Sequence, residues 1–277
     1  MAHFSNKTVV IVGASAGIGA EVARRFAAQG ARLVLAARGA DKLAAFAESL
    51  RTTGTQVLAI SMDLGSDADC RRLIDETVAT FGGFDILICN AALHHRGSVE
   101  SNDADDLAMM VHVNLRAPIL LTRLALPHLR SRGGGTVVQV ASLAGCVPTP
   151  GSATYSATKF GLRAFARALD DELRGSGIRI KVVSPGPVDT GFILDDLDRV
   201  TDLTLSQPMS TASEVAAAIV DLSSNDRFER KMPWQSGLLT TLGYIAPFVG
   251  RVVRPLLERK GRAARERLRE RLAKPLR

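Results

Sequence analysis

The sequence predicts an α/β protein with a single doubly wound parallel sheet and helices on both faces, and three observations lead to this prediction. Short apolar runs alternate with longer amphipathic runs over the first two-thirds of the chain. The apolar runs are almost continuous Val, Ile and Leu, which is typical of strands buried on both faces. A glycine-rich stretch follows the first apolar run directly. Strands and helices that alternate in this way form parallel sheets with right-handed crossovers.

The expected elements follow one another in order along the chain. We expect strands at TVVIVG, RLVLAA, QVLAIS, DILICN, TVVQVAS and IRIKVVS, and helices over residues 17–29, 41–51, 66–81, 103–129 and 154–173. After Ser184 the pattern loosens into a PGPVDTG loop, an aperiodic stretch over 192–211, a helix over 213–222 and a candidate last strand at KMPW. The chain is therefore divided into a sheet domain, 1–230, and a helix-prone C-terminal extension, 231–277.

Composition and cysteine content narrow the class of protein. The chain has 277 residues, of which 46% are apolar and 23% charged, and this suits one large globular domain with an appendage. Cys70, Cys89 and Cys146 form no CxxC pair, so we expect no disulfide framework and a reducing environment. No signal-peptide pattern precedes the first strand, and no run reaches the ~20 apolar residues of a membrane span. The expected location is cytoplasmic.

The glycine-rich stretch is GASAGIG, residues 13–19, between the first strand and the first helix. Glycines at such a turn let the backbone approach a phosphate, and the helix N-terminus offers unpaired N–H groups and the positive end of its dipole. Ligands of doubly wound sheets bind at this carboxyl edge. The stretch therefore predicts a Rossmann-like dinucleotide site, although such a motif taken alone also occurs in ordinary turns. No GK[ST] follows, which excludes a Walker loop.

The end of the second strand favours one form of the cofactor. A carboxylate there would bind the 2′-hydroxyl of NAD(H), whereas a guanidinium would bind the 2′-phosphate of NADP(H). The sequence has Arg38 at this place and no acid, and arginine can form paired hydrogen bonds to phosphate oxygens. We therefore favour NADP(H) over NAD(H), against the alternative of a solvated surface arginine.

Further motifs occur in the order and spacing of the short-chain dehydrogenase/reductase family, which the chain resembles over about residues 7–220. After GASAGIG these are Asp63–Leu64, Asn90–Ala91–Ala92, Asn114, Ser142, the YxxxK pair Tyr155 and Lys159, and PGPVDT at 185–190. Two positions depart from the family pattern, since Val12 replaces the usual Thr before the glycines and Ala92 replaces the last Gly of NAG. Neither change removes a catalytic group.

The resemblance implies a nicotinamide-dependent oxidoreductase that interconverts a carbonyl and an alcohol by hydride transfer. It makes 1–230 a catalytic domain with Asn114, Ser142, Tyr155 and Lys159 as catalytic residues. The cofactor-binding residues expected from it, together with Arg38, are Gly13, Ser15, Ala16, Gly17, Ile18, Gly19, Asp63, Leu64, Asn90, Ala91, Ala92, Tyr155, Lys159, Pro185, Gly186, Val188 and Thr190. No metal site is expected, because His94 and His95 lack a carboxylate at metal-ligand spacing and are interpreted as partly exposed loop residues.

The chemistry of the four side chains agrees with these roles. Tyr155 and Lys159 are four residues apart, so they share one face of a helix. The ammonium should lower the phenol pKa from ~10 toward neutrality, so that Tyr155 can exchange a proton with the substrate oxygen. Ser142 can bond the same oxygen, and the resemblance implies that Lys159 also holds the nicotinamide ribose and that Asn114 positions a water beside it. The alternative is a non-catalytic NADP(H)-sensing protein, which would not require the intact set.

The C-terminal extension concentrates the charge of the chain. Residues 251–277 carry 11 Lys or Arg and 3 Asp or Glu, whereas the first 250 residues carry a net charge of −1. With the apolar stretch 237–250, this segment could form a lid over the substrate cleft, a dimer contact or a contact with an anionic membrane surface. A lid or a membrane contact favours a lipid-, steroid- or retinoid-like substrate. No nucleic-acid partner is expected, because aromatic spacing and a recognised module are missing.

The expected assembly is a homodimer, with a tetramer as the alternative. The helices that carry Asn114 and Tyr155 form the usual dimer contact of the family that the chain resembles. The DGG-like turn that pairs subunits into tetramers in many members has no counterpart here.

Overall fold

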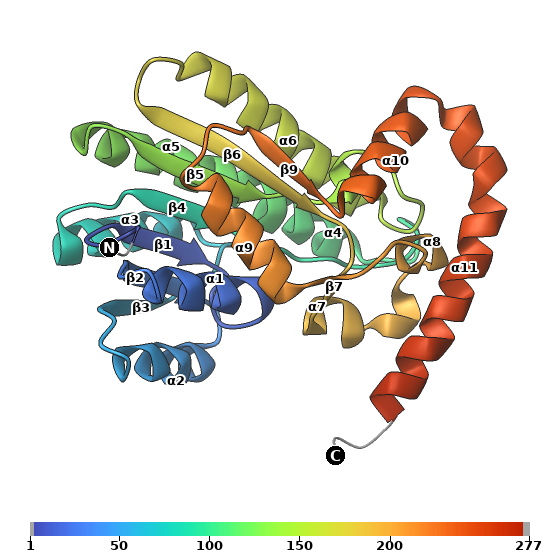
Figure 1. Cartoon of the computed structure of the whole chain (residues 1–277), viewed down its shortest axis with the longest axis horizontal. Coiled ribbons are helices and arrows are strands. Elements are labelled where there is room, and N and C mark those ends of the chain that lie inside the picture. The colour runs from blue at the N-terminus through green and yellow to red at the C-terminus, as the bar shows by residue number, and fades with distance from the viewer. Residues whose placement is uncertain (1–2, 274–277) are drawn as a thin grey trace.

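The computed structural model describes residues 3–273 and contains one seven-stranded parallel sheet with helices on both faces (Figure 1). The strand order is β3-β2-β1-β4-β5-β6-β9, so the direction of winding reverses between β1 and β4. In doubly wound sheets the ligand crevice lies at the carboxyl ends of the two strands where this reversal occurs. The predicted fold class is confirmed.

The strands of the main sheet are close to those expected. They are β1 Thr8–Val12, β2 Arg32–Ala37, β3 Val57–Ser61, β4 Ile86–Cys89, β5 Gly135–Val140, β6 Ile178–Pro185 and β9 Glu229–Met232. The short strands β7 Val188–Asp189 and β8 Ser210–Thr211 pair with each other in a separate two-stranded ladder.

The helices that cover the sheet are also close to those expected. They are α1 Gly17–Ala27, α2 Ala40–Arg51, α3 Asp67–Phe81, α4 Ala104–Val111, the π-helical turn η1 His112–Arg116, α5 Ala117–Ser131, α6 Ala153–Glu172 and α9 Ala212–Leu222. The smaller elements after β5 and β6 are η2 Leu143–Gly145, α7 Gly191–Leu194, η3 Leu197–Arg199 and α8 Asp202–Leu205, and the C-terminal helices are α10 Trp234–Ile245 and α11 Pro247–Ala273.

Two apolar cores lie on the two faces of the sheet, because successive side chains of a strand point to opposite faces. Val9 and Ile11 of β1 pack against α1, α2 and α9, whereas Val10 and Val12 pack against α3, α5 and α6. All four valine and isoleucine side chains are buried. This explains why the strand sequences read as continuous apolar runs.

The helix expected over 103–129 is interrupted by the π-helical turn η1. Asn114 lies in this turn and is fully buried. Its Oδ1 accepts a hydrogen bond from the Leu93 N–H at 2.7 Å, and its Nδ2 donates to the Leu93 carbonyl oxygen at 2.7 Å. The extra residue of a π turn changes the direction of one side chain, and such turns are frequent at functional sites.

The last strand β9 spans the expected domain boundary at residues 230 and 231. Glu229 holds it to the body, since its carboxylate accepts hydrogen bonds from Arg163 of α6 at 2.7 and 2.8 Å and from Ser184 of β6 at 2.7 Å. The carbonyl oxygen of Met232 in turn accepts a hydrogen bond from the Gly186 N–H at 2.7 Å. The candidate strand at KMPW is therefore present, two residues earlier than expected.

The arrowheads of the strands in Figure 1 point toward the side of the molecule where α7, α8, α10 and α11 gather. The extension thus lies at the carboxyl edge of the sheet, where the ligand crevice of this fold is expected. Among the helices of residues 3–273, none is both long and apolar enough to cross a membrane.

Candidate active site

The turn between β1 and α1 has the backbone geometry of a phosphate cradle. Gly13 has a φ of 81°, and a Cβ atom there would lie 2.8 Å from the Ala91 backbone. A Cβ on Gly19 would lie 2.0 Å from the Gly13 carbonyl oxygen, which the Asn90 side chain also contacts through a hydrogen bond at 2.9 Å. Ala16 precedes α1 and has no side chain that could cap it, so the first N–H groups of this helix stay available. These residues fit the pyrophosphate of a dinucleotide.

One cavity of about 1300 Å³ connects this turn with the YxxxK pair. The expected site residues that line it are Gly13, Ser15, Ala16, Gly17, Ile18, Arg38, Asp63, Leu64, Asn90, Ala91, Ala92, Ser142, Tyr155, Lys159, Pro185, Gly186, Val188 and Thr190. Gly19 and Asn114 do not line it. Gly19 lies behind Gly13, and Asn114 supports the Leu93 backbone, which forms part of the wall.

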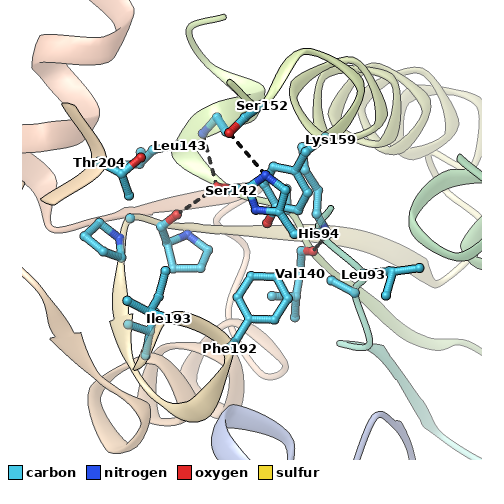
Figure 2. Close-up of a pocket in the computed structure, with 18 of the residues that line it drawn as sticks. Leu93, His94, Val140, Ser142, Leu143, Ser152, Lys159, Phe192, Ile193 and Thr204 are labelled. Carbon is cyan, nitrogen blue, oxygen red and sulfur yellow. Dashed lines mark hydrogen bonds between the residues drawn. The ribbon is translucent and has the colours of Figure 1, made fainter. Parts of the chain in front are cut away.

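Ser142 and Lys159 lie beside the end of β5 (Figure 2). Tyr155 is close to Lys159 on the same helix. Lys159 is 1% exposed, its Nζ donates a hydrogen bond to the Val140 carbonyl oxygen at 2.9 Å, and it lies 5.6 Å from the centroid of the Tyr155 ring. Ser142 Oγ donates to the Pro185 carbonyl oxygen at 3.3 Å and accepts from the Ala144 N–H at 3.1 Å. The hydroxyl is thus held at the junction of β5 and the PGPVDT loop.

Burial is the largest cause of the pKa shifts of Tyr155 and Lys159. It raises the pKa of the Tyr155 phenol to about 12, which the hydrogen bond of Ser142 and the charge of Arg96 only partly offset. It lowers the pKa of the Lys159 ammonium to about 8. The direction for Tyr155 is opposite to the one expected from the sequence, because the phenolate loses more by desolvation than it gains from nearby cations. Near pH 7 the phenol is neutral and therefore able to donate a proton.

The adenosine end of the cavity contains the residues expected to select the cofactor. Arg38 is exposed at the end of β2 and lines the cavity, as does Lys42 on α2, which the sequence analysis missed. Asp63 accepts a hydrogen bond from the Gly65 N–H at 2.9 Å, and Leu64 beside it is buried. Two cations therefore face the region where the second strand ends.

His94 contacts Tyr155 directly. Its ring stacks on Tyr155 with centroids 4.0 Å apart and planes 13° apart. Its Nε2 lies 3.1 Å from Ser152 Oγ, as Figure 2 shows. Burial lowers the pKa of His94 to about 3, so the ring is neutral at ordinary pH. His94 is a partly exposed loop residue, as the sequence predicts, and it also borders the cavity. Its only signal in the sequence is its place two residues after Ala92.

Arg96 is the second functional residue that the sequence analysis missed. This buried guanidinium donates hydrogen bonds to the Phe192 carbonyl oxygen at 2.8 Å and to Asp196 at 3.2 Å, and it lies 5.4 Å from the Phe192 ring centroid. Phe192 in turn lies 6.4 Å from Tyr155, ring to ring. Arg96 therefore holds the segment that covers the substrate side of the phenol.

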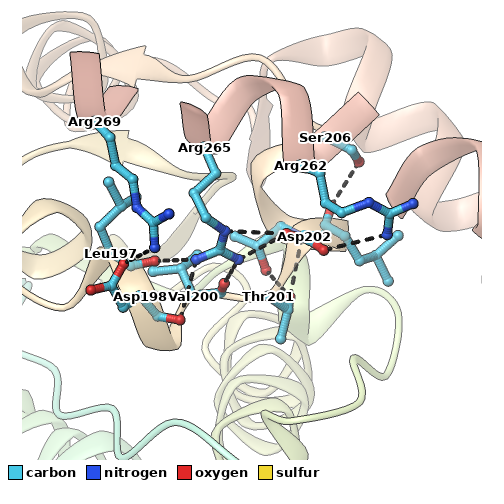
Figure 3. Close-up of polar contacts among 11 residues, drawn as sticks. Leu197, Asp198, Val200, Thr201, Asp202, Ser206, Arg262, Arg265 and Arg269 are labelled. Carbon is cyan, nitrogen blue, oxygen red and sulfur yellow. Dashed lines mark hydrogen bonds and ion pairs between the residues drawn. The ribbon is translucent and has the colours of Figure 1, made fainter. Parts of the chain in front are cut away.

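The C-terminal extension forms one wall of the cavity and is fixed by its arginines (Figure 3). Arg265 donates hydrogen bonds to the carbonyl oxygens of Leu197 and Val200 and, at 2.8 Å, to the Asp202 carboxylate. Arg269 pairs with Asp198 at 2.5 Å. The cavity residues contributed by the extension are Leu239, Thr240, Leu242, Gly243, Tyr244, Pro247, Val253, Arg254 and Leu257.

The chain is similar to several known oxidoreductases. A family model described as short chain dehydrogenase matches residues 7–198. A ketoacyl reductase HetN of Nostoc is 34% identical over 221 residues, which are 79% of this chain and 77% of that protein. An 11-beta-hydroxysteroid dehydrogenase of Pinus massoniana is 38% identical over 66% of this chain and 52% of that protein.

Two solved structures share the architecture. A metagenomic short-chain oxidoreductase in complex with NADP is 27% identical with a TM-score of 0.71, covering 83% of this chain and 97% of that one. A short-chain dehydrogenase/reductase of Burkholderia phymatum in complex with NAD is 24% identical with a TM-score of 0.80, covering 90% and 97%. The second likeness concerns the fold alone.

Proposed function

The chain belongs to the short-chain dehydrogenase family and is an oxidoreductase that acts on CH–OH groups with a nicotinamide cofactor, and on this premise we propose that it interconverts a carbonyl and an alcohol on a hydrophobic small molecule with NADP(H). The observation that supports this most directly is the cavity that joins the glycine turn, Arg38 and Tyr155 to an apolar wall. A bound nicotinamide would supply or accept the hydride.

The side chains of the site divide the remaining work. In the direction of reduction, the neutral Tyr155 phenol donates its proton to the substrate oxygen, and Ser142 Oγ bonds the same oxygen. Lys159, charged below its pKa of about 8, stabilises the phenolate that Tyr155 becomes. Asn114 holds the Leu93 backbone and with it the wall that carries His94. His94 keeps one face of the phenol dry by stacking on it.

The NADP(H) preference is tested through Arg38. A guanidinium contributes paired hydrogen bonds to a 2′-phosphate and none to a ribose diol. We expect Arg38→Asp to weaken NADPH binding ~100-fold and not to weaken NADH binding, because the new carboxylate can bond the ribose 2′-hydroxyl, as measured by fluorescence titration. Lys42→Ala is the matched comparison for the second cation. Equal losses for the two cofactors in Arg38→Asp would contradict the preference.

The apolar wall supports a hydrophobic substrate. Beyond Tyr155 the cavity is lined by Val147, Pro148, Phe192, Ile193, Leu203, Leu239, Leu242 and Tyr244. The similar protein from Pinus massoniana is named for a hydroxysteroid, which agrees with a lipid-, steroid- or retinoid-like substrate. NADPH oxidation against a panel of ketones and aldehydes of increasing chain length tests this. We expect kcat/KM to rise with apolar area, and a preference for short polar carbonyls would contradict it.

For assembly and location, we propose a cytoplasmic homodimer, with a tetramer as the alternative, that contacts a membrane surface peripherally. The dimer contact would use α4, α5 and α6, and Val111 at the end of α4 is 41% exposed, which agrees with this face. Light scattering of the wild type and of Val111→Arg measures the mass. A monomeric wild type would contradict the dimer.

A further inference from the structure

The outer side of the extension is apolar at helical spacing. Nine of the fourteen exposed large apolar side chains among the described residues lie between Trp234 and Leu256. Seven of them recur every three or four residues, so that each helix has one apolar outer face. We name these seven the apolar rim: Trp234, Leu238, Leu242 and Ile245 of α10 and Phe248, Val252 and Leu256 of α11. Isolated apolar side chains on a surface need no explanation, but a continuous set of this kind marks an interaction site.

The apolar rim continues into the cavity. Leu242 is 54% exposed and also lines the cavity, and the same holds for Tyr244 at 57%. On the other side of the same two helices, Thr240 and Val253 face the cavity as well. The two helices thus form a wall with the substrate space on one side and the apolar rim on the other. Leu242 and Tyr244 therefore connect the apolar surface with the cavity, and Arg254 is a charged residue on the same wall.

The charges around the apolar rim are of one sign. No charged residue occurs in α10. On α11, Arg254, Arg259 and Lys260 are exposed close to the rim, and the single acid nearby, Glu258, is paired with Arg254 at 2.7 Å. Apolar side chains flanked by cations are complementary to the interface of an anionic bilayer, where the tails bury the former and the headgroups attract the latter. Trp234 and Tyr244 are side chains that favour this interface.

We propose that the apolar rim docks on an anionic lipid bilayer and that the hydrophobic substrate passes from the bilayer into the cavity beside Leu242 and Tyr244. The docking makes the membrane contact proposed above specific, and the route of the substrate rests on the proposed carbonyl–alcohol function. The basic second half of α11 does not provide this contact, because Arg265 and Arg269 are bound to the 197–202 segment (Figure 3). A second protein on the rim would cover the mouth of the cavity, whereas a bilayer would supply an apolar substrate there.

The docking is tested by flotation with phosphatidylcholine vesicles that contain or lack phosphatidylglycerol. We expect the wild type to float with the anionic vesicles and only weakly with the neutral ones. Phe248→Glu/Val252→Glu should reduce the partition coefficient ~100-fold, since each side chain accounts for about a factor of ten. Val99→Glu is the matched control, because Val99 is 54% exposed in a loop outside the extension. Circular dichroism and thermal unfolding establish that all three proteins are folded.

Several results would overturn the docking. The wild type could stay unbound with both kinds of vesicle, or the double variant could float like the wild type. Light scattering tests whether a second copy of the chain occupies the rim instead. In that case the double variant would have a lower mass than the wild type, and vesicles would bind neither protein. If Val99→Glu weakened vesicle binding as much as the double variant does, the binding would not depend on the apolar rim.

The route of the substrate has its own readout. With a long-chain ketone dissolved in anionic vesicles, we expect the KM of the double variant to rise about tenfold with kcat unchanged, and with a short water-soluble ketone no change. Equal effects on both ketones would overturn the route while leaving the docking intact. If neither ketone is turned over by the wild type although it floats, the proposed function fails and the docking stands.

Discussion

The residues of the sheet body and those of the C-terminal extension are held in place by different kinds of interaction. In the body, strand ends and glycine turns place the functional groups, so that Lys159 and Ser142 lie where β5 stops and the next helix begins. In the extension, long side chains bridge to another segment of the chain, as Arg265 does when it bonds four groups, the carbonyl oxygens of Leu197, Asp198 and Val200 and the Asp202 carboxylate. The body carries the motifs that define a reaction, and the extension carries none.

If this difference extends to function, variants at Tyr155 and Lys159 change kcat for every substrate, whereas variants in the extension change KM and do so selectively for apolar substrates. The variants below test this expectation in order of decreasing effect.

Tyr155→Phe removes the phenol hydroxyl, the group that we propose as the proton donor, and keeps the ring. We expect kcat to fall ~100-fold or more for every carbonyl substrate, because a positioned acid contributes that much, while dinucleotide affinity and Tm stay the same. Steady-state kinetics, a cofactor titration and thermal unfolding measure the three quantities. A wild type and a variant that are equally inert on a broad panel but bind NADPH would favour the cofactor-sensing alternative.

Lys159→Met should lower kcat by a similar factor and yet raise stability at pH 7. The folded-state pKa of Lys159 is lowered from 10.5 to about 8, so the unfolded chain binds the proton more tightly. The buried charge lowers the free energy of unfolding by its full amount below about pH 8, and this destabilisation disappears as the pH rises to the pKa of Lys159 in the unfolded chain. We expect a gain in the free energy of unfolding on the order of 1 kcal/mol at pH 7, after loss of the bond to Val140.

Urea unfolding tests the direction of this change in stability. The wild type and Lys159→Met are compared at pH 7 and near the pKa of an unfolded Lys. The difference between the two proteins should shrink as the pH rises. A variant that is less stable than the wild type at pH 7 would contradict the burial effect.

Gly261→Ala should detach α11 from the body. A Cβ atom there would lie 1.8 Å from the Asp202 carbonyl oxygen, and neither backbone can yield that much. We expect KM for apolar substrates to rise ~10-fold, with kcat for a short ketone nearly unchanged, and the 189–206 segment to be cleaved faster by protease. Ala263→Ser, at an exposed position of the same helix, is the control. Unchanged KM and cleavage would show that the extension does not shape the cleft.

Arg265→Lys should have the smallest effect of this set. Lysine keeps the charge but cannot bond the Leu197 and Val200 carbonyl oxygens and the Asp202 carboxylate together. We expect a ~3-fold rise in KM and faster hydrogen exchange in residues 197–202, compared with Arg267→Lys at an exposed position. An equal effect of the two variants would mean that only net charge matters.

The sequence predicted the fold class, the strands and helices of the sheet body, and most of the residues that meet at the cavity. Several of these residues lie at or just after a strand end, as Ser142 does after β5, where the topology decides their neighbours, and Tyr155 and Lys159 reach the same place from α6. It failed where side-chain contacts decide. The stack of His94 on Tyr155 and the anchoring of Phe192 by Arg96 depend on loop paths that no period reveals. The raised pKa of Tyr155 depends on burial, which spacing does not measure. The assignment of catalytic and cofactor roles to single residues stays a prediction.

The docking of α11 on the 197–202 segment also has a consequence for how the protein is made. α11 follows all strands of the sheet in the chain, and domains fold from the N-terminal side during synthesis. The nucleotide crevice can therefore form while the wall of the substrate cleft does not yet exist. A nascent chain would bind dinucleotide before it could select a substrate.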